Sequence, residues 1–376
     1  MHVADVTLFF APHSGGVKRY LMAKHAFLSA QPGMRHSLLV PSARTSTTDC
    51  GIHMLKSAPL AAGGYRVPLR PDRWRALLNE LAPDVIEAGD PYHLAWMAID
   101  AARDLGIPAV AFAHSDLARV LGSRFGRGIG ALTDRYLRLL YSRFDLVLAP
   151  SRIIAQRLEA LGLDNVDVQP LGVDSATFHP DRRNPRLREE LGLAPETRLL
   201  IFAGRLGREK QIPQLVEAFA SLGSPYHLLI VGGPSSASLA PNVTLLPYEQ
   251  DATRLASLLA SADALVHAGL HETFGLVLVE AMACGRPVIA MRSGAIGEHV
   301  DDEVGVLAEP GDVRALRAAI EALYTRDWQA MGWRARERVE RSYAWRRVFA
   351  AQIERYRVLA GHRIAASAPA DVPSVP

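Results

Sequence analysis

Two glutamates, Glu272 and Glu280, stand eight positions apart in a mostly apolar stretch of the chain. Glu280 follows the apolar run 276–279 and precedes the run 281–283, so a helix through it is apolar nearly all round and is expected to be buried. A buried carboxylate without hydrogen-bond donors is strongly destabilising, and no Lys or Arg follows before Arg286. Either a ligand or internal N–H groups and water must therefore supply its donors.

The residues between the two glutamates predict how they are held. Glu272 comes shortly after the mostly apolar run 262–268, which is typical of a strand end and a loop, so the two glutamates are expected on different elements. The loop Thr273, Phe274 and Gly275 then opens the helix. A helix N-terminus has unpaired N–H groups and a partial positive charge that suit anionic or hydroxylated ligands. Gly275 would let backbone come close to such a ligand.

A second pattern that could do chemistry is a pair of basic residues directly after the predicted strand 199–203. Arg205 offers a planar fork for phosphate oxygens, and Lys210 offers a compact charge. The pair could therefore bind a diphosphate and stabilise the charge that develops on it when it leaves. On spacing alone, a surface salt bridge with Glu209 is an alternative.

These stretches resemble the Glu-x7-Glu signature of the retaining glycosyltransferases of family four, together with the strand, Gly-Arg and Lys element that holds the donor diphosphate in that family. Further stretches match the family in the expected order: 171–174 with Phe178 and Pro180, 229–233, 305–307 and 310–312. The resemblance implies the GT-B architecture, an α/β fold of two Rossmann-like, doubly wound domains that face each other across a cleft.

The elements that must position these residues follow from short apolar runs that alternate with helix-like segments. Such alternation indicates parallel sheets with helices on both faces, and its two series indicate two domains. The first series is 6–10, 37–40, 85–87, 109–113 and 146–149, and the second is 199–203, 228–231, 243–245, 264–266 and 288–290.

We place an acceptor domain at 1–175 and a donor-binding domain at 176–343, because Pro, Asp and Arg break the apolar pattern near 170–190. Apolar residues at helical spacing predict a helix over 344–361, and the resemblance implies that it crosses back to the first domain. The tail 364–376 has little to bury, and we expect it to be disordered.

The resemblance also implies roles for the candidate residues of the second domain. Arg205 and Lys210 would hold the diphosphate and assist its departure. Glu272, with the backbone of 273–275, would face the transferred sugar and take part in catalysis. Glu280 would accept hydrogen bonds from the ribose hydroxyls of the donor.

Candidates in the first domain follow predicted strands. Gly15 and Gly16 come after the first strand and Ser14, and the resemblance makes them contacts to the diphosphate or the sugar. A lone His such as His114, at the end of a strand, is more often structural, but the family commonly has a catalytic His there that touches the sugar. Asp90 could reach an acceptor hydroxyl or serve a turn or helix cap. Three histidines are weaker candidates: His13, His267 and His271.

Composition and charge limit the partners, the cysteine chemistry and the cellular location to be expected. A net charge of +3 over 376 residues gives no reason to expect nucleic acid as a partner. The only cysteines, Cys50 and Cys284, form no metal motif and indicate a reduced, cytoplasmic protein without disulfides. The N-terminus lacks the features of a signal peptide, and no apolar stretch approaches the length of a spanning helix.

A basic cluster leaves open whether the protein lies peripherally on the inner face of a membrane. Arginines interleaved with apolar residues give a basic face beside an apolar one, which suits an anionic membrane surface or an anionic acceptor. An ordinary core-facing helix with a solvated basic side explains the spacing equally well. The arginines are Arg119, Arg124, Arg127, Arg135, Arg138 and Arg143.

Together these patterns predict a retaining glycosyltransferase that moves a hexose-type sugar from a UDP- or GDP-linked donor to a hydroxyl acceptor, a glycan or glycolipid of the cell envelope. Because no Asp-x-Asp motif is present, we expect no essential metal and no cofactor besides the nucleotide-sugar substrate. An epimerase or phosphorylase of the same fold and a non-catalytic nucleotide-sugar-binding subunit remain alternatives. A dinucleotide-dependent oxidoreductase is disfavoured, because neither half shows a Gly-x-Gly-x-x-Gly motif after its first strand.

Overall fold

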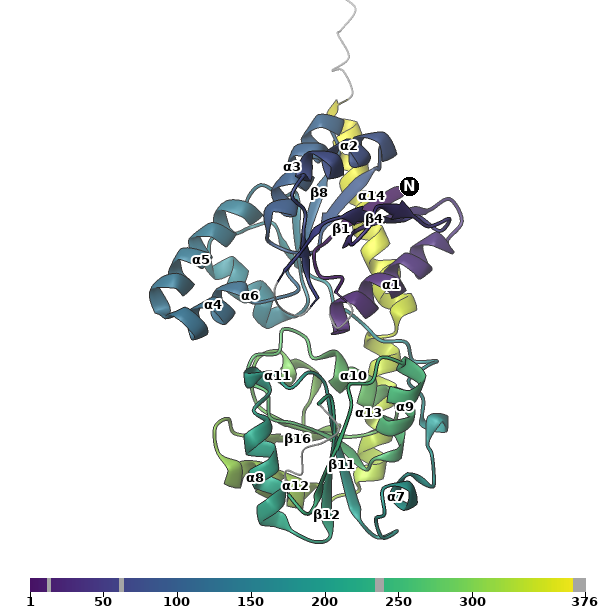
Figure 1. Cartoon of the computed structure of the whole chain (residues 1–376), viewed down its shortest axis with the longest axis vertical. Helices are drawn as coiled ribbons and strands as arrows, with labels where there is room; N and C mark the ends of the chain where they lie inside the picture. Colours follow the sequence, from purple (N-terminus) through teal and green to yellow (C-terminus); the bar gives the residue numbers. More distant parts are fainter. Residues whose placement is uncertain (12–14, 61–63, 234–239, 368–376) are drawn as a thin grey trace, which may run out of the picture. The chain divides into compact units, whose positions relative to one another are not determined.

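The computed structural model describes residues 1–11, 15–60, 64–233 and 240–367 of the chain. They fall into two compact units (Figure 1). The first comprises Met1–Pro150, Ile154–Gln169 and the chain from Phe349 onward, and the second comprises Ser151–Ile153 and Pro170–Val348. The main division thus lies at Gln169 and Pro170, whereas the sequence placed it at 175–176.

The first unit is built on a sheet with the strand order β10-β9-β8-β7-β1-β2-β4-β3. Neighbouring strands are parallel except β3 and β4, which are antiparallel. The strands are β1 (His2–Val6), β2 (Arg35–Ser42), β3 (Ser46–Thr47), β4 (Ile52–Lys56), β7 (Val85–Ala88), β8 (Ala109–Phe112), β9 (Leu146–Ala149) and β10 (Val166–Val168). A separate antiparallel pair is formed by β5 (Ala58–Pro59) and β6 (Arg66–Val67).

Between the parallel strands β2 and β4 the connection carries only the short strand β3, and the other parallel strands of the first unit are joined by connections that include helices. These helices are α1 (Gly15–Ser29), α2 (Pro71–Leu81), α3 (His93–Leu105), α4 (Leu117–Phe125), α5 (Arg127–Tyr141) and α6 (Arg152–Ala160).

The second unit carries an all-parallel sheet with the order β13-β12-β11-β14-β15-β16. Its strands are β11 (Arg198–Ala203), β12 (Tyr226–Val231), β13 (Val243–Leu246), β14 (Ala264–His267), β15 (Val288–Met291) and β16 (Gly305–Ala308). Its helices are α7 (Leu187–Glu190), α8 (Ile212–Leu222), α9 (Ala252–Ser261), α10 (Leu276–Ala283), α11 (Ile296–His299), α12 (Val313–Leu323) and α13 (Trp328–Ser342), with short 3-10 turns η1 (Pro180–Arg182) and η2 (Arg208–Lys210).

Each sheet has one place where the winding direction reverses. In the first unit the chain moves outward from β1 through β2 to β4 and then returns to place β7 against β1. In the second unit it moves from β11 through β12 to β13 and returns to place β14 against β11. Ligands of open α/β sheets bind at this reversal, beyond the carboxyl ends of the strands. A ligand site is therefore expected at the carboxyl ends of β1 and β7 in the first unit and at those of β11 and β14 in the second.

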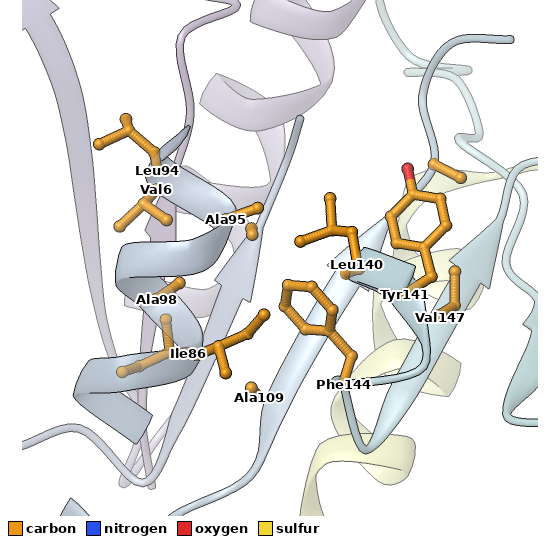
Figure 2. Close-up of a cluster of buried hydrophobic side chains, with 14 of the residues drawn as sticks. Val6, Ile86, Leu94, Ala95, Ala98, Ala109, Leu140, Tyr141, Phe144 and Val147 are labelled. Atoms are coloured by element: carbon orange, nitrogen blue, oxygen red, sulfur yellow. The ribbon is translucent and has the colours of Figure 1, made fainter. Parts of the chain in front are cut away.

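Continuous apolar runs form the strands because both faces of each sheet are covered by helices. Figure 2 shows one such layer in the first unit, where Leu94, Ala95 and Ala98 of α3 and Leu140 of α5 pack against strand residues such as Ile86. The second unit has its own core, which includes the buried side chains Leu200, Phe202, Phe219, Leu228 and Ile230.

Two elements differ from their expected bounds by four residues or more. The first strand is His2–Val6 instead of 6–10, because the residues after Val6 bend to meet the carboxyl end of β7, where the backbone N–H of Leu8 binds Asp90. The last helix, α14, spans Trp345–Ser367, so the start of the predicted disordered tail, 364–367, is helical. The rest of that tail, 368–376, lies outside the described residues.

Candidate active site

The reversal point of the second unit brings Lys210 and Glu272 together. Lys210 ends the 3-10 turn η2, which follows β11, and Glu272 lies in the loop between β14 and α10. The ammonium of Lys210 forms an ion pair with Oε1 of Glu272, and the two side chains are only 19% and 15% exposed. The predicted diphosphate ligand and the predicted sugar ligand are thus direct neighbours.

His267 completes this group and is the residue that sequence reasoning undervalued. It is the last residue of β14, its side chain is buried, and its Nε2 lies 3.0 Å from Oε1 of Glu272. The backbone N–H of Gly269 donates to Nδ1 of the same ring at 3.1 Å. Since Nδ1 accepts, the ring proton lies on Nε2, where it faces the carboxylate.

The charge on Glu272 follows from these neighbours. Burial by itself would raise the pKa of the carboxyl group, but the adjacent Lys210 ammonium and the contact with His267 outweigh burial and hold the pKa well below its usual range. Glu272 is therefore an anion at neutral pH. Its Oε1 is engaged by two partners, which leaves Oε2 as the better acceptor for hydroxyl groups.

The backbone at Glu272 is fixed by a loop from another strand. The N–H of Ala295, after β15, donates to the carbonyl of Glu272 at 2.9 Å. A Cβ on Gly294 would lie 2.5 Å from that carbonyl oxygen, and the φ of Gly294 is +57°, so only glycine fits there. The N–H of Leu270 also donates to the carbonyl of Glu209 at 3.2 Å, which links the loop after β14 to η2. The relative position of Lys210 and Glu272 is thus set by several loops together.

The loop 273–275 leads into α10 as predicted, and the structure separates its backbone from its side chains. Gly275 caps the helix with a left-handed φ of +83°, and no side chain caps the first turn. The Phe274 ring is buried and packs against His299 and Tyr343, with ring centroids 4.6 Å and 5.8 Å away. Only the backbone of Phe274 is therefore free to contact a ligand. Thr273 is half-buried beside it.

Glu280 lies in the middle of α10 and is 3% exposed, so its predicted burial is confirmed. Buried apolar residues surround it in sequence, including Val279 and Ala281. Cys284 lies one turn later on the chain. Burial, and to a smaller extent the nearby Glu280, raises the pKa of its thiol to about 12.

Arg205 differs from Lys210 in its surroundings. It is exposed in the loop after β11, and within the described part of the chain it forms no ion pair with Glu209. Lys210 likewise pairs with Glu272 and not with Glu209. The structure thus does not contain the surface salt bridge that was the alternative explanation of this basic pair.

The reversal point of the first unit holds the N-terminus of α1 and Asp90. Gly15 and Gly16 open α1, and Gly15 has a φ of +62°. The preceding His13 and Ser14 lie outside the described residues. Asp90 is 3% exposed and accepts hydrogen bonds from the N–H of Leu8 at 2.5 Å and from the hydroxyl of Thr7 at 3.2 Å.

These contacts tie the end of β1 to the end of β7, which favours the turn role for Asp90 over contact with an acceptor. Burial raises the pKa of Asp90 to about 6, although the hydrogen bonds from Leu8 and Thr7 act in the opposite direction. The carboxyl group therefore changes its protonation state close to physiological pH.

His114 lies just beyond β8 and is held by aromatic rings. Its imidazole stacks on Phe112 with a centroid distance of 4.1 Å and meets the edge of Tyr20 at 5.4 Å. Burial lowers the pKa of His114 to about 3, and the charge of Lys24 acts in the same direction. The ring is therefore neutral at physiological pH and can both donate and accept a hydrogen bond. His271, by contrast, is exposed.

Lys24 of α1 is a fully buried cation that sequence reasoning missed. Its ammonium lies 2.8 Å from Oδ2 of Asp5 and 2.7 Å from Oε1 of Glu87, and donates to the hydroxyl of Tyr356 at 2.9 Å. Gln352 donates to Glu87 at 3.1 Å, so the network joins α1, β1 and β7 to α14. A signal was available: Lys24 shares a helical face with apolar residues that are all buried, Tyr20, Leu21 and Leu28.

Two family models match the chain. One, described as "Glycosyltransferase Family 4", covers residues 14–177, and the other, "Glycosyl transferases group 1", covers residues 183–340. A Mycobacterium tuberculosis protein named GDP-mannose-dependent alpha-(1-6)-phosphatidylinositol dimannoside mannosyltransferase is 31% identical over 373 residues, which are 94% of this chain and 95% of that protein. The chain belongs to glycosyltransferase family 4.

Further similarities support this membership and the GT-B fold. A GDP-mannose-dependent alpha-mannosyltransferase of Corynebacterium glutamicum is 30% identical over 85% of this chain and 80% of its own length. Sucrose-phosphate synthase from Thermosynechococcus elongatus has a TM-score of 0.80 at 21% identity, over 98% of this chain and all of that one. The Anabaena HepE protein in complex with UDP-glucose has a TM-score of 0.76 at 20% identity, over 96% of this chain and all of that one. The predicted GT-B fold is confirmed, and this family 4 member is a glycosyltransferase.

The described residues offer neither a side-chain cluster suited to a metal ion nor a helix suited to crossing a membrane. Among the described residues, no group of three or more His, Cys, Asp and Glu side chains is arranged to hold a metal ion. In the same part of this family 4 chain, no helix is both long and apolar enough to cross a membrane. Both cysteines are free, Cys50 exposed and Cys284 buried.

Proposed function

We propose that this glycosyltransferase is a retaining α-mannosyltransferase that transfers mannose from GDP-mannose to a hydroxyl group of a lipid-linked glycan. The names of the relatives that are 30–31% identical over most of the chain support GDP-mannose as the donor and an α-linkage in the product. The name of the Mycobacterium tuberculosis relative also supports a glycolipid acceptor.

The observation that carries the proposal is the Lys210, Glu272 and His267 group at the reversal point of the second sheet. An ammonium has three N–H donors, so Lys210 can contact the diphosphate while it pairs with Glu272. Arg205 adds a second, exposed cation on the same loop. Two cations near the bridging oxygen stabilise the charge that develops on the departing diphosphate.

Glu272 and Glu280 would bind hydroxyl groups at different parts of the donor. Glu272 is ionised, so its carboxylate accepts hydrogen bonds from sugar hydroxyls, and the uncapped first turn of α10 offers backbone N–H groups next to it. Glu280 lies one turn into that helix and would accept from the ribose hydroxyls. Gly15, Gly16 and the neutral His114 of the first unit are proposed as further contacts to the diphosphate and the sugar.

Retention is proposed to follow from attack on the face that the diphosphate leaves. The bond between C1 of mannose and the phosphate oxygen breaks, the acceptor oxygen bonds to C1 on the same face, and the acceptor proton passes to the released phosphate oxygen. Glu272 is a poor candidate for a nucleophile, because both Lys210 and His267 bind its Oε1 and lower its reactivity. The same cations would make a metal ion unnecessary.

A donor panel tests the proposal. Thermal stability is measured with GDP-mannose, UDP-glucose and ADP-glucose, since a ligand at about 100 times its Kd stabilises the native state by about 2.7 kcal/mol. GDP-mannose should give the largest rise in Tm, and product NMR should show an α-mannosidic linkage. A rise with UDP-glucose and none with GDP-mannose would overturn the donor assignment, and a β-linked product would overturn retention.

A further inference from the structure

Helices α4 and α5 expose an unusual number of large apolar side chains. Of the markedly exposed large apolar residues in the described part of the chain, five fall within the 20 residues from 120 to 139. They reach exposed fractions of 63% at Leu132 and 60% at Phe125. We call this surface the α4–α5 face, and its apolar members are Val120, Phe125, Ile129, Leu132 and Leu139.

The exposed face is distinct from the face that builds the core. The opposite side of α5 buries Leu137, Leu140 and Tyr141, and Figure 2 shows Leu140 and Tyr141 in the packed layer on the sheet. The two helices also contact each other closely, since a Cβ on Gly122 would lie 3.3 Å from Cα of Gly130. The inner side of these helices therefore supplies the packing against the core. Core packing does not account for the apolar residues exposed on the outer side.

Basic residues accompany the apolar ones along this segment. The segment 117–143 contains six arginines and a single acidic residue, Asp134, whereas the whole chain has a net charge of only +3. All six arginines are exposed, and within the described residues none of them forms an ion pair. They are Arg119, Arg124, Arg127, Arg135, Arg138 and Arg143.

The nearby carboxylates are engaged elsewhere. Asp116, just before α4, caps that helix and forms an ion pair with Arg157 of α6. Asp134 also contacts Arg157, at 3.5 Å. The half-buried Arg157 thus pairs with both of these carboxylates, and neither of them forms an ion pair with an arginine of segment 117–143.

We propose that the α4–α5 face docks the first unit on an anionic lipid bilayer. A lipid headgroup layer is the surface that accepts both features at once, because apolar side chains enter the boundary with the acyl chains while guanidinium groups bind the phosphates. Exposed apolar residues separated by arginines on α5, such as Leu132, Arg135 and Leu139, match such a layer better than a dry protein interface, whose centre is depleted of charge.

Docking at this place would serve the proposed reaction, and in this respect the inference rests on the proposed function. Helix α4 begins at Leu117, immediately after the segment that carries His114 beyond the carboxyl end of β8. A face that starts at the ligand-binding edge of the sheet would hold that edge near the headgroup of a lipid-linked acceptor.

Vesicle sedimentation tests the proposal. Wild-type protein should bind vesicles of equal parts phosphatidylcholine and phosphatidylglycerol, bind phosphatidylcholine vesicles far less, and be released by salt. The variant Leu132→Ser/Leu139→Ser and the variant Arg127→Gln/Arg135→Gln/Arg143→Gln should each weaken binding about tenfold or more. Because all five positions are exposed, the variants should keep the wild-type Tm.

Matched controls lie in the second unit. Trp333 is 58% exposed, and Arg346 and Arg347 are exposed at the start of α14. Trp333→Ser and Arg346→Gln/Arg347→Gln should bind vesicles like wild type. Equal losses in controls and face variants, absence of wild-type binding, or equal binding to neutral vesicles would each overturn the proposal. A dimer in solution that the face variants abolish, without vesicle binding, would reassign the face to contact between two copies.

The test also separates this inference from the proposed function. Face variants should keep the Tm rise with GDP-mannose and wild-type turnover with a water-soluble acceptor, because no face residue belongs to the donor site. Vesicle binding without any response to GDP-mannose would refute the donor assignment and leave the docking face intact. A rise in Tm with GDP-mannose but no vesicle binding would refute the docking face and leave the donor assignment intact.

Discussion

Replacing Lys210 and Arg205 one at a time should distinguish an effect on turnover, which both residues share, from an effect on stability, which only Lys210 has. The sequence alone could not distinguish these effects. Both residues are assigned to the diphosphate, so Lys210→Met and Arg205→Met should each lower turnover by about tenfold or more, a loss of about 1.4 kcal/mol of transition-state stabilisation. Only Lys210, however, is also a partner of a buried carboxylate.

The magnitude for stability follows from exposure. Without Lys210, Glu272 would keep its burial and lose its cation, and leaving a buried acceptor unsatisfied costs about 1–3 kcal/mol. The remaining contact with His267 and the 15% exposure of Glu272 favour the lower part of that range. Arg205 is exposed and unpaired with Glu209, so Arg205→Met should change the unfolding free energy by no more than about 0.5 kcal/mol.

Urea denaturation and initial rates on the same preparations decide the matter. The double variant Lys210→Met/Glu272→Gln removes the uncompensated charge, so it should recover much of the lost stability while turnover stays low. The reasoning is refuted if Lys210→Met is as stable as Arg205→Met, or if the double variant is no more stable than Lys210→Met. Normal turnover in either single variant would instead remove that residue from the diphosphate site.

Four further predictions can be checked on purified protein. Turnover should persist in excess EDTA, and an activity that chelation abolishes and Mg²⁺ or Mn²⁺ restores would contradict metal independence. Glu280→Gln should weaken nucleotide binding in titrations, because a neutral amide is a poorer acceptor for the ribose hydroxyls than a carboxylate; near-normal affinity, with or without a stability loss of about 1–3 kcal/mol, would contradict the ribose assignment. Lys24→Met should lower the unfolding free energy by about 3–5 kcal/mol, because two buried carboxylates lose their cation, and adding Asp5→Asn and Glu87→Gln should restore part of it. For Asp90, the raised pKa means that its protonated form stabilises the fold below the unfolded pKa of about 3.9 and that this contribution disappears as pH rises through about 6. Asp90→Asn should therefore gain stability relative to wild type between pH 5 and pH 7, and an unchanged difference over that interval would argue against a buried, titrating carboxyl.

The local sequence pattern determined where most strands lie and which side chains are buried. The alternating apolar runs gave strands within a few residues of those observed, because a strand buried on both faces must be apolar throughout its length. The first strand was placed too late, since the apolar residues after Val6 belong to the turn toward β7. Burial of Glu280 was also foreseeable, because every neighbour on its helix is apolar.

What local pattern could not supply was the order of the strands. Lys210 and Glu272 meet because β14 returns to pair with β11, with Leu200 beside Ala264, after the chain has first built β12 and β13. His267 acquires its role in the same way, from the residue that strand order places against it.

The Lys24 network shows the same limit over a longer distance. Its carboxylates come from β1 and β7, and its hydroxyl and amide come from α14, at the other end of the chain. Residue type and periodicity report the environment of one element at a time. Partners separated by tens or hundreds of residues are decided only when the sheet and its covering helices assemble, because the free energy of such pairs depends on the burial that assembly creates.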